Sequence, residues 1–200
     1  ITLAATASVV AGMDKGIKNL SMLNMALAIF LLVVVFFIGP SIHILETFLQ
    51  NTGDYLSGLV ARTFNLQAYS RSDWIGNWTL FIFGWTIAWA PFVGLFIAKI
   101  SRGRTIRQFV FGVLAVPTLF TFLWFSVFGD TALYLIMNEG LNTLIADVQA
   151  DHAVALFQLY DQLPWSSFLS LLTVCLIITF FVTSSDSGSL VVDSLASGGA

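Results

Sequence analysis

Three long stretches without a single charged side chain constrain this sequence more than any other feature. They cover residues 74–98, 109–129 and 162–185. As a helix rising 1.5 Å per residue, each stretch is long enough to cross the ~30 Å hydrocarbon core of a bilayer. The sequence therefore predicts an all-α membrane protein.

The composition agrees with this prediction. Hydrophobic residues make up 58% of the chain and charged residues 10%, with a mean hydropathy of +0.90, whereas roughly a quarter of an ordinary soluble domain is charged. A fourth apolar run covers residues 21–45. Residues 1–13 are also apolar and show neither an initiator methionine nor a signal-peptide n-region, so we expect them to be the tail of an earlier helix in a fragment of a longer chain.

The charged residues predict the topology. Six of the eight basic residues fall in two clusters separated by two spans, and residues 130–161 contain five acidic residues and no lysine or arginine. The positive-inside rule places both basic clusters in the cytoplasm and the acidic segment outside. The clusters are Lys15 with Lys18, and Lys99 with Arg102, Arg104 and Arg107. The predicted spans are residues 21–45, 74–99, 108–128 and 163–185, and an amphipathic helix over residues 54–68 is expected in the membrane interface.

Aromatic residues recur at helical spacing along the second predicted span. Pro91 interrupts this span and frees the carbonyl of Ile87, which needs a partner in a cavity or on another helix. An aromatic face that lines a pathway would attract a cation without hydrogen-bond donors, such as a quaternary ammonium. The spacing alone is equally compatible with an aromatic packing seam. The members of the stripe are Trp78, Phe81, Trp85, Trp89, Phe92 and Phe96.

The stretch "FFVTSSDSGS" near the end of the chain is rich in hydroxyl groups. On a helix, Phe180, Thr183, Ser184 and Ser187 share one face. Hydroxyl and backbone oxygens are ligands that a sodium ion accepts, although the same pattern fits a plain polar helix terminus with a solvated Asp186. Cys175 is the only cysteine, so neither an internal disulfide nor a thiolate metal site is expected.

Several stretches together resemble the betaine/choline/carnitine transporter family. They include "GMDKGIKNLSMLNM", "GDYLS", "GWTIAWAPFVGLFIAKISRGRTIRQF", "VPTLFTFLWFSVFGDTAL" and "FFVTSSDSGSLVVD". The resemblance implies part of a leucine-transporter-type bundle of two inverted five-helix repeats, with the solute bound near the midplane. It also implies a multi-pass protein of the plasma membrane, and it suggests a homotrimer.

The resemblance assigns roles to individual residues. Trp85 and Trp89 match tryptophans that line the solute site and its pathway, and Phe92 matches a neighbouring pathway aromatic. Thr86 departs from the pattern, because many members carry a second tryptophan there that forms one wall of an aromatic box. Members that use sodium bind it through residues matching Phe180, Thr183 and Ser184, while other members use protons or exchange solutes.

The resemblance thus implies ion-coupled, osmoprotective transport of choline, glycine betaine or carnitine, with the stretches "GDTAL" and "SSDSGSLVVDSLASGGA" favouring the choline-uptake branch. The expected partners of the protein are the solute, Na⁺ or H⁺ and the bilayer. No nucleic acid and no cofactor are expected. One alternative is a transporter of the same fold for a sulfonium or amino-acid-like osmolyte, and another is a structural or channel subunit. An intramembrane enzyme is disfavoured because the sequence has no G-x-S-x-G or H-E-x-x-H motif.

Overall fold

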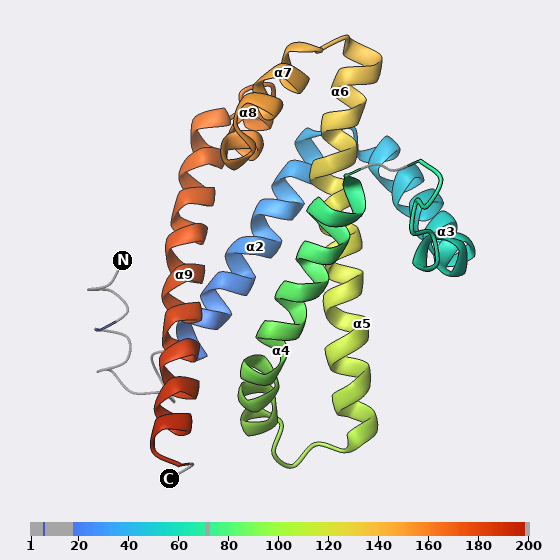
Figure 1. The fold of residues 1–200 in the computed structure, drawn as a ribbon. Helices are drawn as coiled ribbons and strands as arrows, with labels where there is room; N and C mark the ends of the chain where they lie inside the picture. The colour runs from blue at the N-terminus through green and yellow to red at the C-terminus, as the bar shows by residue number, and fades with distance from the viewer. Residues whose placement is uncertain (1–5, 7–17, 71–72, 199–200) are drawn as a thin grey trace.

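The computed structural model describes residue 6, residues 18–70 and residues 73–198, and their regular structure is entirely helical (Figure 1). Four helical segments are long and apolar enough to cross a membrane, namely Lys18–Ile38, Ile75–Ala98, Ile106–Glu139 and Ser166–Asp193. The all-α membrane fold expected from the sequence is confirmed. The expected helix tail at residues 1–13 lies, apart from residue 6, outside the described residues.

The helices follow one another with few irregular connections (Figure 1). The main elements in chain order are α2 (Lys18–Ile38), α3 (Ser41–Thr63), α4 (Phe81–Ile100), α5 (Ile106–Trp124), α6 (Thr131–Glu139) and α9 (Ser166–Ala196). Two π-helical turns interrupt this series, η2 (Ile75–Leu80) before α4 and η3 (Phe125–Asp130) between α5 and α6. The short elements α7 (Thr143–Ala150), η4 (His152–Val154) and α8 (Ala155–Tyr160) connect α6 to α9.

The first span is shorter than the predicted 21–45, because the chain bends at Gly39 and Pro40. A residue that precedes proline is driven away from the helical conformation, and Pro40 has a ψ of 71°. Gly39 also lies close to its neighbours, since a Cβ there would be 2.9 Å from the Val35 carbonyl oxygen and 3.3 Å from Thr131 Oγ1. After the bend, α3 continues as one helix to Thr63 and contains much of the interfacial helix predicted at residues 54–68.

The later helices are longer than the predicted spans. The third candidate span continues past residue 128 through η3 and α6 to Glu139, because Asp130 is buried and does not end the helix. The fourth helix continues from the predicted end at 185 to Ala196, through the hydroxyl-rich stretch. Asp130 and the hydroxyl-rich stretch therefore lie inside these two helical segments and not at their ends.

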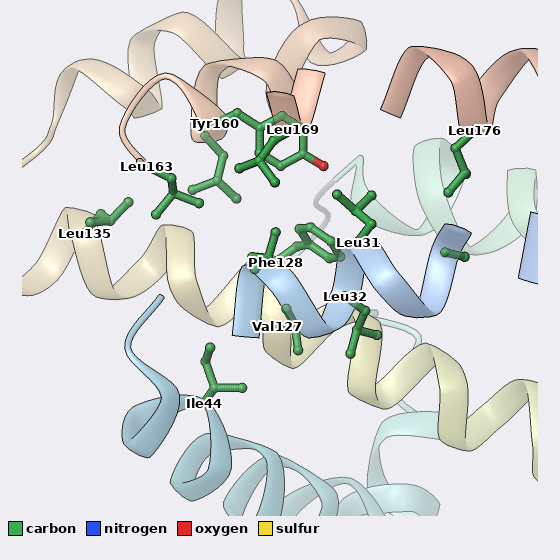
Figure 2. Packing of buried hydrophobic residues seen from close by; sticks show 13 residues of the cluster. Leu31, Leu32, Ile44, Val127, Phe128, Leu135, Tyr160, Leu163, Leu169 and Leu176 are labelled. Atoms are coloured by element: carbon green, nitrogen blue, oxygen red, sulfur yellow. The ribbon is translucent and has the colours of Figure 1, made fainter. Parts of the chain in front are cut away.

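The buried core surrounds α2. This helix lies between α9 on one side and η3 on the other (Figure 1). Figure 2 shows Leu31 and Leu32 of α2 beside Phe128 of η3 and Leu169 of α9, which form part of one buried cluster. Tyr160 of α8 belongs to the same cluster, and its hydroxyl lies 2.9 Å from Thr173 Oγ1 of α9.

The Tyr160 hydroxyl is expected to stabilise this end of the core. Burial raises the pKa of Tyr160, and the hydrogen bond with Thr173 opposes this only in part, so the hydroxyl stays protonated and able to donate. Tyr160→Phe leaves Thr173 without its side-chain partner and should lower the free energy of unfolding by about 1 to 2 kcal/mol. The measurement is the melting temperature of the intact protein in detergent. Tyr69→Phe is the matched control, because Tyr69 is fully exposed in this chain; equal melting temperatures for the two variants would contradict the assignment.

Candidate functional site

The predicted solute-pathway residues all lie on α4. Pro91 sits inside this helix, as the sequence indicates. Trp85 and Trp89 are one turn apart, and their rings stack with centroids 6.1 Å apart and an interplanar angle of 29°. About half of each indole is exposed in this chain (59% and 51%), so the described helices leave one side of the ring pair uncovered.

Thr86 adds no free hydrogen-bond donor to this side of α4. Its hydroxyl donates to the Ile82 carbonyl oxygen of the preceding turn at 2.7 Å, a common local bond for threonine in a helix. A tryptophan at this position would add a large aromatic face, whereas threonine adds one methyl group and an occupied hydroxyl. The aromatic surface of α4 is therefore smaller than the pattern with two adjacent tryptophans would give.

Phe92 connects the aromatic helix to α9. Gly188 of α9 presents no side chain, and a Cβ built there would lie 3.6 Å from Phe92 Cζ. This contact brings Phe92 within about one helical turn along α9 from Thr183 and Ser184. The fold therefore joins the two stretches that the sequence singles out, although they are almost a hundred residues apart.

The three predicted sodium residues differ in their surroundings. Thr183 is buried against α2, while Ser184 and the Phe180 ring (43%) are exposed in this chain. The Thr183 hydroxyl lies 3.0 Å from the Phe180 carbonyl oxygen and 3.2 Å from that of Thr179, to which it donates. Its oxygen accepts one hydrogen bond from α2 and keeps one lone pair that can face a cation, so the hydroxyl is compatible with the predicted role.

Asn24 of α2 is a candidate site residue that the sequence reasoning missed. Its Nδ2 donates to Thr183 Oγ1 at 3.1 Å, and its Oδ1 is buried without a hydrogen-bond partner among the described residues. An amide oxygen is a hard ligand of the kind that alkali and alkaline-earth cations accept, and a buried polar atom without a partner is costly. The available signal was one asparagine within the apolar run "SMLNMALAIF".

Asp186 is buried in α9, with only 1% of its surface exposed. The interpretation of this residue as a solvated group at a helix terminus is therefore wrong. The helix continues beyond it, and a carboxylate inside a candidate span usually faces the bundle interior. Among the described residues, no group of three or more histidine, cysteine, aspartate or glutamate side chains could hold a metal ion.

Comparison with known proteins agrees with the resemblance. The model of the betaine/carnitine/choline transporter family matches residues 1–200. The chain belongs to this family of membrane transporters, which is not a family of enzymes.

Three relatives illustrate the range of this similarity. The chain is 49% identical to a glycine betaine transporter and 44% identical to an osmo-independent choline transporter, both of Acinetobacter baylyi; each match covers 98% of this chain, and 30% and 38% of the relative. It is 42% identical to a glycine betaine/proline/choline/ectoine transporter of Vibrio parahaemolyticus, over 100% of this chain and 35% of that protein. The chain thus spans about a third of the length of these relatives.

The close approach of α4 and α9 should depend on the small size of residue 188. Gly188→Ala places its Cβ at an ordinary contact distance from Phe92 and should be tolerated. Gly188→Leu adds three further carbon atoms in the same direction, and overpacking of this kind costs about 1 to 3 kcal/mol. Thermal unfolding of the intact protein should therefore show a lower melting temperature for leucine but not for alanine. A leucine variant as stable as the alanine variant would argue against this helix contact.

Proposed function

We propose that the intact transporter carries a quaternary-ammonium solute across the plasma membrane. The observation that supports this function best is the stacked pair of Trp85 and Trp89 in a helix without charged residues between 74 and 98. Family membership supplies the context, since the similar proteins are named as transporters of glycine betaine, choline or both.

Aromatic rings suit such a solute for a physical reason. A methylated ammonium group has a permanent charge and no N–H donor, so hydrogen bonds cannot hold its nitrogen. A buried carboxylate would attract it but is expensive to place at membrane depth. The face of an indole attracts the cation with about 0.5 to 2 kcal/mol per ring without introducing a buried charge.

The two tryptophans should therefore be needed for uptake. In the intact transporter, Trp85→Ala and Trp89→Ala should each lower saturable uptake of labelled glycine betaine or choline by roughly 2- to 30-fold, because a cation–π contact is worth about 0.5 to 2 kcal/mol per ring. Uptake by cells with matched surface expression is the measurement. Trp74→Ala is the control, because Trp74 lies before α4 and stacks on Trp78. Normal uptake by both variants would rule out this assignment of the site.

The identity of the solute is a separate question. Thr86 replaces the second tryptophan of the aromatic box, which favours a solute that needs fewer aromatic contacts than a trimethylammonium group. A sulfonium or amino-acid-like osmolyte is therefore the second candidate. Unlabelled choline, glycine betaine, carnitine and a dimethylsulfonium zwitterion, each competing with the labelled solute, would separate these possibilities.

We further propose that uptake is coupled to sodium through α9 and α2. The Thr183 hydroxyl and the Phe180 carbonyl are neighbours on α9, Ser184 follows directly in sequence, and the buried Asn24 Oδ1 lies on the facing helix. These groups are neutral oxygen donors suited to a monovalent cation. The family also suggests a homotrimer, which the mass of the purified intact transporter in detergent would test.

Sodium coupling predicts a specific effect of the Thr183 hydroxyl. Thr183→Val keeps the shape of the side chain but removes the oxygen, so the sodium concentration that gives half-maximal uptake should rise about ten-fold, since a hydrogen-bond-strength contact to a charge is worth roughly 1.5 kcal/mol. Thr179→Val is the matched control, because its hydroxyl bonds only to the Cys175 and Leu176 carbonyls one turn earlier. If wild-type uptake persists when potassium replaces sodium and follows external pH, a proton and not sodium drives transport.

A further inference from the structure

A cavity whose lining does not include Trp85 or Trp89 lies between α3 and the junction of α5 with η3. Its volume is about 290 Å³. Residues on its walls carry both signs of charge together with aromatic rings, which is unusual in a chain with so few charged groups. The groups that matter for its chemistry are Asp130, Asn51, Tyr55, Phe122, Phe125 and Arg62.

One wall of the cavity suits a cation. Asp130 is buried, with 8% of its surface exposed. Its two carboxylate oxygens accept from Asn51 Nδ2 at 3.2 and 3.4 Å. Tyr55 and Phe122 meet edge to face with centroids 5.0 Å apart, and Phe125 extends the aromatic surface of the same cavity. A carboxylate beside aromatic rings attracts an onium group through both its charge and the ring faces.

Arg62 gives the same cavity a group that suits an anion. The Arg62 side chain folds back along α3 over Gly58. The close approach is shown by the position of Arg62 Nε, which would lie 2.9 Å from a Cβ at position 58. Gly58 therefore makes room for the guanidinium beside the cavity. Asp54, one turn before Gly58, also contributes to the wall, and Arg62 itself is exposed. Its planar fork can bind a carboxylate through two parallel hydrogen bonds.

We infer that this cavity is a second solute site, selective for a zwitterion that carries an onium group and a carboxylate. The inference rests on the proposed function for the class of solute, but it concerns different residues. The onium group lies against Asp130 and the rings, and the carboxylate meets Arg62. Choline offers no carboxylate, so it gains nothing from Arg62. The cavity thus prefers glycine betaine to choline.

The location of the cavity suits a site reached before the tryptophans. η3 follows the 19 residues of α5, which places it nearly 30 Å from the arginine-rich turn at residues 101–105. Because the positive-inside rule puts that turn in the cytoplasm, the cavity lies toward the outside. A solute arriving from outside would meet this site first.

Binding to the intact transporter with Trp85→Ala and Trp89→Ala isolates the cavity from the tryptophan site. Saturation-transfer difference NMR of this purified variant should show binding of glycine betaine and weaker binding of choline. Adding Arg62→Gln should weaken glycine betaine binding about five-fold and leave choline binding unchanged or stronger. Arg102→Gln, in the cytoplasmic turn, is the matched control and should change neither.

A second variant separates loss of the site from loss of folding. Gly58→Ala displaces the guanidinium without removing it, and alanine is a better helix former than glycine, so the protein should stay folded while its preference for glycine betaine falls. The inference would be overturned if Arg62→Gln and Gly58→Ala left glycine betaine binding unchanged. It would also be overturned if the variant without Trp85 and Trp89 gave no glycine betaine signal. Failure of the proposed function would instead appear as tryptophan-independent uptake in the separate transport assay.

Discussion

The fold depends on the demand that every backbone polar group be satisfied without water. In hydrocarbon, a lost backbone hydrogen bond costs several kcal/mol, so the spans must be helical along their full length. Departures from regular helix in the described spans include the bend at Gly39 and Pro40, the prolines inside α4 and α5, and the π-helical turns η2 and η3. Two of these departures lie close to groups assigned to function. Trp85, Trp89 and Phe92 surround Pro91, and Asp130 ends η3.

The same demand explains how polar side chains are paired between the helices. Asn24 reaches Thr183 across the contact of α2 with α9, and Asn51 reaches Asp130 across the contact of α3 with η3. Each bond joins helices far apart in the sequence, and each supplies a partner to a buried polar group. Because such bonds must be broken when the helices separate, they fix which faces of the helices meet.

The sequence was sufficient to predict the helical class, and the structure has four helical segments long and apolar enough to cross a membrane, because absence of charge over a bilayer-length stretch has few structural solutions. It also placed Trp85 and Trp89 on one face, since their four-residue spacing is a property of any helix. It could not predict that α2 ends at Ile38, because Gly-Pro within an apolar run is also found in kinked helices. The Asn24–Thr183 contact and the buried state of Asp186 depend on how distant segments pack, which local periodicity does not contain.

The π-helical turn η3 has a consequence for the whole segment from Ile106 to Glu139. A turn of this kind accommodates an additional residue, and each residue of an α-helix corresponds to about 100° of rotation. The part of this segment before η3 and the part after it are thus rotated relative to each other, compared with one continuous α-helix. Phe125 at the start of the turn points away from the core, whereas Val127, Phe128 and Asp130 are buried. The exposed face before η3 and the exposed face after it therefore point in different directions. Substitutions on one of these faces can accumulate without changing which residues of the other part are buried.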